Sequence, residues 1–167
     1  MSRFMELCLY APGLGYYSAG ATKFGPAGDF VTAPESGRLF AATVSGVLAA
    51  GLRQLGGHAR VLEVGGGSGA FAEVALKRLL ALDALPDRYA ILEPSADLRE
   101  RQRDHLQRTL IPTVFELVEW LDRPFDDDWD GVLFANEVID ALPTPRFLAD
   151  EGEIYEETGE LDGEGRF

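Results

Sequence analysis

The sequence predicts an α/β fold, in which helices cover both faces of a parallel sheet, and three observations support this class. An apolar run at residues 60–64 breaks into a glycine-rich loop at 65–69, and apolar residues then recur at helical spacing. A second apolar run follows at residues 89–92. Residues 131–135 form a continuous apolar run, as expected of a strand buried on both faces. Strand, glycine loop, helix and strand make up a nucleotide-binding βαβ unit, so the sheet is expected to be Rossmann-like.

Local patterns before the glycine loop predict two helices. Residues 2–10 are mostly apolar and indicate a short helix. Thr32 and Glu35 resemble a capping box, which begins a helix that runs to about residue 54. The apolar face of that helix comprises Phe40, Val44, Val47 and Leu48.

Patterns after the glycine loop predict the rest of the sheet. Ser95 can cap a helix that ends near residue 108, because its hydroxyl can accept a hydrogen bond from a first-turn N–H group. Residues 112–119 contain the third strand, which leads into Trp120. The apolar run at 131–135 is then the fourth strand of the sheet.

Composition narrows the classes of function. The chain has 167 residues and a net charge of −13, which disfavours general affinity for nucleic acid backbones. A hydrophobic content of 46% is typical of a folded domain. Cys8 is the only cysteine, so no disulfide forms within the chain, and two histidines exclude a multi-histidine metal site. No run is apolar enough to insert into a membrane, and we expect the cytoplasm of a bacterium, or the mitochondrial matrix in a eukaryote.

The glycine loop fits two classes of ligand, and it can also be a turn that binds nothing. Gly65-x-Gly67-x-x-Ala70 satisfies the dinucleotide pattern, in which alanine can replace the third glycine. Glu63-x-Gly65-x-Gly67-x-Gly69 satisfies the pattern of S-adenosylmethionine (SAM) methyltransferases. Glu63 favours SAM, because its carboxylate attracts the ammonium group of SAM and repels a pyrophosphate. An NAD-dependent oxidoreductase is the alternative, although no acid or base for hydride transfer is evident.

Polar residues mark the ends of three predicted strands, at Glu63, Glu93 and Asn136-Glu137. The carboxyl ends of parallel strands meet at one edge of a sheet, where ligands bind. Glu93 has the spacing of the acidic residue that accepts hydrogen bonds from ribose hydroxyls. Alternatively, Glu93 is a surface residue whose negative charge is stabilised by the dipole of the following helix. Trp120 either lies against an adenine ring or is a half-buried structural tryptophan.

The stretch from Asn136 to Pro143 places three polar side chains after a buried strand. Asn136 either faces a ligand held by the first strand or satisfies loop backbone groups. Glu137 can hold an arginine guanidinium by two parallel hydrogen bonds. Asp140 either shares this role or caps a short turn. We therefore predict Glu137 and Asp140 as catalytic residues.

Several motifs together resemble the MidA-like family of class I SAM-dependent methyltransferases, which includes the mitochondrial complex I assembly methyltransferase. The blocks at residues 28–35 and 136–143 are far more specific than the glycine loop. The matching stretches, which span nearly the whole chain, are Met5-Glu6-Leu7-Cys8-Leu9-Tyr10, Gly15-Tyr16-Tyr17, Phe24-Gly25, Gly28-Asp29-Phe30-Val31-Thr32-Ala33-Pro34-Glu35, Glu63-x-Gly65-x-Gly67-x-Gly69 and Asn136-Glu137-x-x-Asp140-Ala141-Leu142-Pro143.

The resemblance implies that SAM is the cofactor and that proteins are the substrates, with arginine methylation attributed to the mitochondrial branch. It implies a protein partner, such as a respiratory complex I subunit. It also implies that residues 29–35 close over the cofactor, through Asp29, Thr32 and Glu35, although the capping box is a competing interpretation. Together, the motifs and the resemblance predict a cofactor site that comprises Glu63, Gly65, Gly67, Gly69, Glu93, Trp120 and Asn136.

We expect three parts along the chain. Residues 1–59 are a helical and loop segment that caps the cofactor site, residues 60–143 are an incomplete SAM-binding core, and residues 144–167 begin an insertion with a hairpin and an acidic tail. A class I methyltransferase sheet has more strands than the four found here, so we expect a fragment of a larger enzyme. The alternative is a non-catalytic module with the SAM fold that binds a partner.

Overall fold

The computed structural model describes residues 2–17, 37–56, 58–126, 128–159 and 163–164. The chain divides into two units, which we treat separately. The larger unit contains residues 20–138, and the smaller unit combines residues 1–19 with residues 139–167. The predicted division at residues 59 and 143 stays a prediction.

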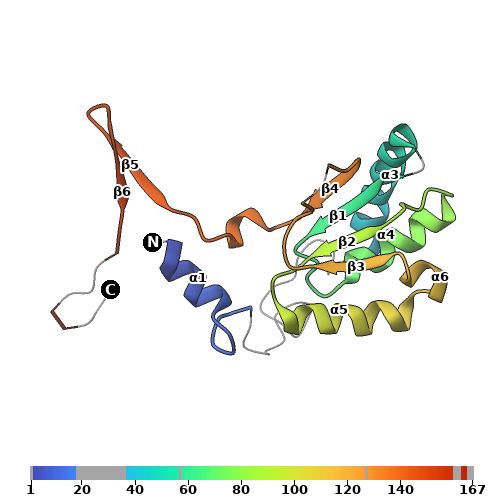
Figure 1. Ribbon diagram of the computed structural model, residues 1–167, viewed down its shortest axis with the longest axis horizontal. Coiled ribbons are helices and arrows are strands. Elements are labelled where there is room, and N and C mark those ends of the chain that lie inside the picture. Colours follow the sequence, from blue (N-terminus) through green and yellow to red (C-terminus); the bar gives the residue numbers. More distant parts are fainter. Residues whose placement is uncertain (1, 18–36, 57, 127, 160–162, 165–167) are drawn as a thin grey trace. The chain divides into compact units, whose positions relative to one another are not determined.

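Four parallel strands form the sheet of the larger unit, in the order β3-β2-β1-β4 (Figure 1). The register aligns Val64 with Leu92 on one side and with Ala135 on the other. The parallel pairing confirms the Rossmann-like α/β class and the four predicted strands. Their bounds are Arg60–Val64 for β1, Tyr89–Leu92 for β2, Val118–Leu121 for β3 and Gly131–Ala135 for β4.

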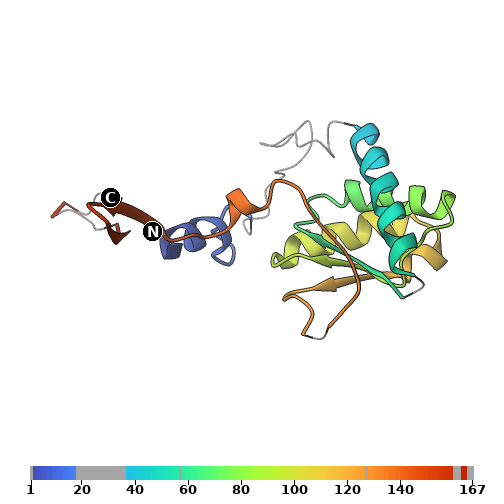
Figure 2. The same ribbon diagram turned by 90° about the horizontal axis from the view of Figure 1, so that it is seen from above.

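The described helices of this unit pack on one face of the sheet, and Figure 2 shows them on one side of the strands. The connections from β1 to β2 and from β2 to β3 run in the same direction, so right-handed crossovers put both helices on that face. The core joins Phe71 to Phe134, whose rings stack with centroids 4.0 Å apart. The helices are α3 Arg38–Leu55, α4 Ala70–Ala81, α5 Ala96–Thr109 and α6 Pro112–Phe115.

Among the described residues of this unit, no helix covers the opposite face of the sheet, whereas the sequence predicts helices on both faces. The chain turns back between β3 and β4, so a right-handed crossover places the described residues of this connection, 122–126 and 128–130, on this face. The described residues of this short connection form no helix; Arg60 lies 5.1 Å from the centre of the Phe125 ring, which lies 5.2 Å from the Trp129 ring. Leu133 of β4 is 59% exposed on this side.

Two local predictions were wrong for physical reasons. Val47 was predicted on the apolar face of α3, but it is 70% exposed. The small residues Ala41, Ser45 and Ala49 face inward instead, which lets α3 pack closely on α4, and Leu48 and Leu52 are buried beside them. The third strand begins at Val118, because Pro112 occupies a first-turn position that starts the short helix α6.

The N-terminus of α5 is capped as predicted. The Ser95 hydroxyl accepts a hydrogen bond from the Leu98 N–H group at 3.3 Å, and Ser95 is buried. We therefore expect Ser95→Ala to lower the free energy of unfolding by about 1 kcal/mol, the usual value of a lost N-cap. Urea unfolding of this variant, with Thr113→Ala at an exposed position as the control, measures the effect. Equal stability of the two variants would contradict it.

The smaller unit contains a helix, a turn and a hairpin. Within it, the Tyr10 hydroxyl at the end of α1, Ser2–Tyr10, donates a hydrogen bond to the Ala141 carbonyl at 2.9 Å. The hairpin pairs β5, Arg146–Asp150, with β6, Glu153–Glu157, which confirms the predicted hairpin. In the part of the chain that the structure describes, no helix has the length and apolarity needed to cross a membrane.

Candidate functional site

The ends of β1, β2 and β4 bring three of the predicted site segments to one edge of the sheet. Because Val64 aligns with both Leu92 and Ala135, the glycine loop, Glu93 and Asn136 follow neighbouring strand ends. The chain runs outward from β1 to β3 and then returns to β4 beside β1. This reversal makes the β1–β4 boundary the place where an open parallel sheet binds ligands.

The glycine loop has the backbone conformation that requires glycine. Gly65, Gly67 and Gly69 have φ angles of 72°, 54° and 85°, in the left-handed region. A Cβ atom on Gly65 would also lie 2.9 Å from a methyl group of Val138. Gly69 is the N-cap residue of α4, whose first N–H groups have no partner within the helix. The loop therefore brings bare backbone and a helix N-terminus to the strand ends.

Glu63 lies beneath the loop and is fully enclosed. Its side chain is 2% exposed, and it accepts a hydrogen bond of 2.8 Å from the Tyr89 hydroxyl on the neighbouring strand. Burial raises the pKa of Glu63 to about 7, the hydrogen bond from Tyr89 opposes the rise, and the nearby charge of Glu93 adds to it. A buried carboxylate of this kind would be stabilised by a cation, such as an ammonium group.

Glu93 is held in one orientation at the end of β2. It is 4% exposed, and one carboxylate oxygen accepts from the Ser95 N–H group at 3.0 Å. The other oxygen accepts from the Gln102 amide at 3.3 Å. Burial raises the pKa of Glu93 above its ordinary value, although these two hydrogen bonds oppose the rise. The geometry differs from that of a solvated surface acid, and it fits the predicted ribose position.

Gln102 is a residue of this site that the sequence interpretation missed. Its amide contacts the glycine loop, Glu93 and Trp120 by three hydrogen bonds. The one available signal was its spacing, because Leu98, Gln102 and Leu106 lie four residues apart on the buried side of α5.

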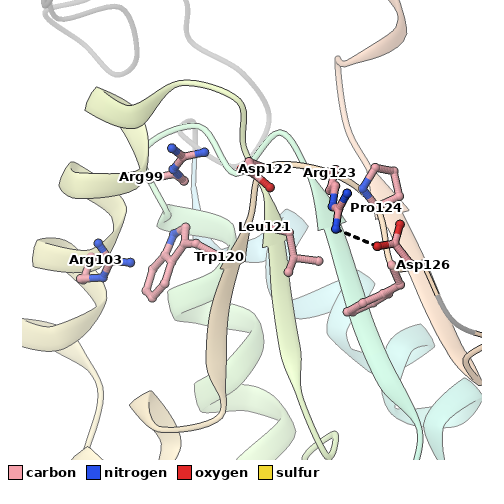
Figure 3. A pocket seen from close by; sticks show the side chains of 9 residues that line it. Arg99, Arg103, Trp120, Leu121, Asp122, Arg123, Pro124 and Asp126 are labelled. Atoms are coloured by element: carbon pink, nitrogen blue, oxygen red, sulfur yellow. Dashed lines mark ion pairs between the residues drawn. The ribbon is translucent and has the colours of Figure 1, made fainter.

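Trp120 packs against α5. Its indole N–H donates to the Gln102 side-chain carbonyl at 3.0 Å, and the Arg103 guanidinium lies 4.5 Å from the ring centre. The sequence left two roles open for Trp120, and these contacts favour that of a half-buried structural tryptophan. The contact with adenine stays a prediction. A pocket of about 510 Å³ opens beside the ring, and Figure 3 shows Arg99 and Arg103 on its α5 side. Asp122, directly after β3, also lines this pocket.

The predicted catalytic residues lie after β4. Asn136 is half-buried, and the exposed Glu137 has a φ angle of 54°, which is uncommon for a residue other than glycine. Such backbone strain often occurs at functional sites. Asp140 is exposed within the 3-10 helix Ile139–Ala141, which belongs to the smaller unit. The prediction that Asp140 shares the role of Glu137 therefore stays a prediction.

Three predicted cofactor residues lie outside the described part of the chain, namely Asp29, Thr32 and Glu35. Their closure over the cofactor stays a prediction. The capping box does not begin helix α3, because that helix begins at Arg38, with Gly37 at its N-cap position and no side-chain cap hydrogen bond. Among the described residues, no group of three or more His, Cys, Asp or Glu side chains is arranged to hold a metal ion.

The fold and the glycine loop define a Rossmann-like nucleotide-binding domain, and comparison with known proteins identifies its family. A family model described as "Putative S-adenosyl-L-methionine-dependent methyltransferase" matches residues 43–167. A mitochondrial protein arginine methyltransferase NDUFAF7 homolog from Caenorhabditis elegans is 28% identical, over 88% of this chain and 39% of the relative. Since the family model matches more than half of the chain, the protein belongs to this methyltransferase family, as the MidA-like motifs predict.

Solved structures agree with this assignment. A COG1565 superfamily member from Burkholderia thailandensis, bound to S-adenosyl-homocysteine (SAH), is 42% identical with a TM-score of 0.84, over 98% of this chain and 43% of that protein. A native structure of an uncharacterized COG1565 superfamily protein from the same organism is 40% identical with a TM-score of 0.79, over 98% and 41% of the two chains. The chain thus spans about two fifths of the length of the relatives that it matches.

Proposed function

We propose that the protein transfers a methyl group from SAM to a side-chain nitrogen of a protein, and that this nitrogen belongs to arginine. The observation that carries the proposal is the SAH-bound Burkholderia structure, because it matches 98% of this chain at 42% identity. SAH is the product that SAM leaves after methyl transfer. The name of the Caenorhabditis elegans relative supports arginine as the acceptor.

The described residues fit SAM in charge and shape. The left-handed glycines keep Cβ atoms out of the space above the loop, where the backbone can approach a ligand. Buried Glu63 beneath the loop provides a negative charge for the methionine ammonium group. Glu93 at the end of β2 offers a fixed carboxylate to the ribose hydroxyls. A pyrophosphate would meet the buried Glu63 carboxylate here, which disfavours NAD.

The chemistry requires little beyond positioning. SAM supplies, when bound, a methyl group attached to a positively charged sulfur. An arginine nitrogen forms a new bond to that carbon as the carbon–sulfur bond breaks, and the nitrogen gives up one proton to solvent. Glu137 would hold the guanidinium by charge-assisted hydrogen bonds and keep the attacking nitrogen in line.

The proposed partner is a protein that presents an exposed arginine. By family resemblance, a respiratory complex I subunit is the substrate we propose to test first. The mitochondrial name of the Caenorhabditis elegans relative supports a matrix location for such a pair in a eukaryote.

Glu137→Gln tests the catalytic part of the proposal. We expect methyl transfer to arginine peptides to fall at least about ten-fold, because a charge-assisted bidentate contact is replaced by a neutral one. SAH affinity should stay within about two-fold, since the proposal assigns Glu137 to the substrate rather than to the cofactor. Radiolabelled methyl transfer and calorimetry measure the two quantities.

Glu151→Gln is the matched control, because Glu151 is also an exposed glutamate with a positive φ angle, at the tip of the hairpin. It should change neither quantity. Equal losses of transfer and SAH affinity in Glu137→Gln would contradict the substrate role. NADH fluorescence enhancement without SAH binding would favour an oxidoreductase instead.

A further inference from the structure

Gln102 is a polar residue at a core position of helix α5. It is 0% exposed, and the other buried residues of α5 are Leu98 and Leu106, one turn away on either side. A leucine would fill such a position without any hydrogen bonds. Since an amide buried without partners is unfavourable, its presence here points to the partners it serves.

The amide of Gln102 joins three separate segments of the candidate site. Its nitrogen donates to the Gly67 carbonyl at 2.9 Å and to the Glu93 carboxylate at 3.3 Å. Its oxygen accepts from the Trp120 indole N–H at 3.0 Å. Both amide protons and the carbonyl are thus engaged, with the glycine loop, the end of β2 and β3.

The side chain also supports the loop by direct packing. A Cβ atom on Gly66 would lie 3.1 Å from the Gln102 side-chain nitrogen, and a Cβ atom on Gly69 would lie 3.6 Å from the Gln102 Cα atom. The loop glycines therefore lie against Gln102, and a Cβ atom on Gly66 would also meet a methyl group of Ile91 at 2.7 Å. A change in the Gln102 side chain would therefore change the position of the loop backbone.

These contacts have a consequence for the direction of the loop groups. In a trans peptide the C=O and the following N–H point in opposite directions. Because Gln102 holds the Gly67 carbonyl toward α5, the Ser68 N–H group is directed away from α5. The same amide fixes one oxygen of Glu93, whose remaining lone pairs then keep a constant direction.

Building on the proposed function, we propose that Gln102 is a positioning residue of the cofactor site: it fixes the Gly67 peptide and the Glu93 carboxylate relative to each other without touching the ligand. Its effect on SAM or SAH binding passes through these two groups. A filler of the same volume that lacks hydrogen bonds would leave the fold in place and loosen the site.

Gln102→Met tests this, because methionine has a similar length and volume but no amide. We expect SAH affinity, measured by calorimetry on the folded protein, to fall about ten-fold, as for loss of a hydrogen bond to a charged group. Gln107→Met on the exposed side of the same helix is the control and should bind like the unmodified protein. If Gln102→Met does not fold, Gln102→Asn, which withdraws the amide by one methylene, should give the same loss.

A double-mutant cycle with Glu93→Gln separates positioning from a merely structural role. If Gln102 acts through Glu93, adding Gln102→Met to the Glu93→Gln protein should lower SAH affinity by less than about three-fold. Independent, multiplying losses would overturn the proposal. Unchanged SAH affinity in Gln102→Met, whatever its melting temperature, would also overturn it.

The proposal has a readout that does not depend on SAH. Amide hydrogen exchange at residues 65–69 should be faster in Gln102→Met than in Gln107→Met, because the Gly67 carbonyl has lost its anchor. If the unmodified protein does not bind SAH, the proposed function fails, and faster exchange confined to the loop would still support positioning by Gln102. Equal exchange in the two variants would overturn it.

Discussion

Gly67→Arg should abolish SAH binding, with a loss of at least about a hundred-fold in affinity. Gly67 has a φ angle of 54°, and its carbonyl is held by Gln102. An arginine at this position strains the backbone by about 1–2 kcal/mol and projects a long cationic side chain from the loop. That side chain would occupy the space of the ligand and repel the ammonium charge of SAH.

Calorimetry with SAH measures this loss, and circular dichroism shows whether the variant is folded. Gly46→Arg is the matched control, because Gly46 lies on the exposed side of α3 and a Cβ atom there would meet nothing within 4 Å. It should bind SAH normally. Normal binding by folded Gly67→Arg would show that the ligand does not occupy the glycine loop.

Glu63→Gln should stabilise the protein, and more strongly at high pH. Folding raises the pKa of Glu63 from 4.5 to about 7, so the folded state favours the neutral acid. The stability from this protonation is fully present below pH 4.5 and is lost as the pH rises through 7. A neutral glutamine avoids the loss, so the expected gain is about 3 kcal/mol at pH 8 and about 1 kcal/mol at pH 5.5.

Urea unfolding at the two pH values measures this gain, with Glu100→Gln on the exposed side of α5 as the control. Glu63→Gln should also bind SAH more weakly, because it lacks the charge that we propose for the ammonium group. Stability gained at the expense of binding is the usual pattern when a buried charge serves a ligand. A gain that does not depend on pH would show that folding does not raise the pKa of Glu63.

Much of the larger unit could be predicted because its signals are local. The strands at 60–64, 89–92 and 131–135 coincide with their predicted bounds, since each is a short apolar run between turn residues. The Ser95 cap and the hairpin also depend on neighbours in the sequence. Val47 was misplaced because the rotation of a helix about its axis depends on what it packs against.

The location of the candidate site could be predicted from the ends of the strands, but the contacts between its side chains could not. Glu63, Glu93 and Asn136 could be grouped because parallel strands have their carboxyl ends at the same edge. The partners of these residues could not be derived in the same way. Tyr89 donates to Glu63 only because the register of β1 and β2 places the two side chains on the same face.

The sequence by itself determined the order of elements, the glycine loop, the acidic residues beside it and the methyltransferase family. Each of these is a pattern of residue types at short spacing, which local geometry converts into structure. Only the tertiary structure decided that Glu63 is buried with a raised pKa, and that Gln102 joins Gly67, Glu93 and Trp120. Burial and hydrogen bonding between distant segments depend on how helices and strands pack, and residue spacing along the chain does not specify that packing.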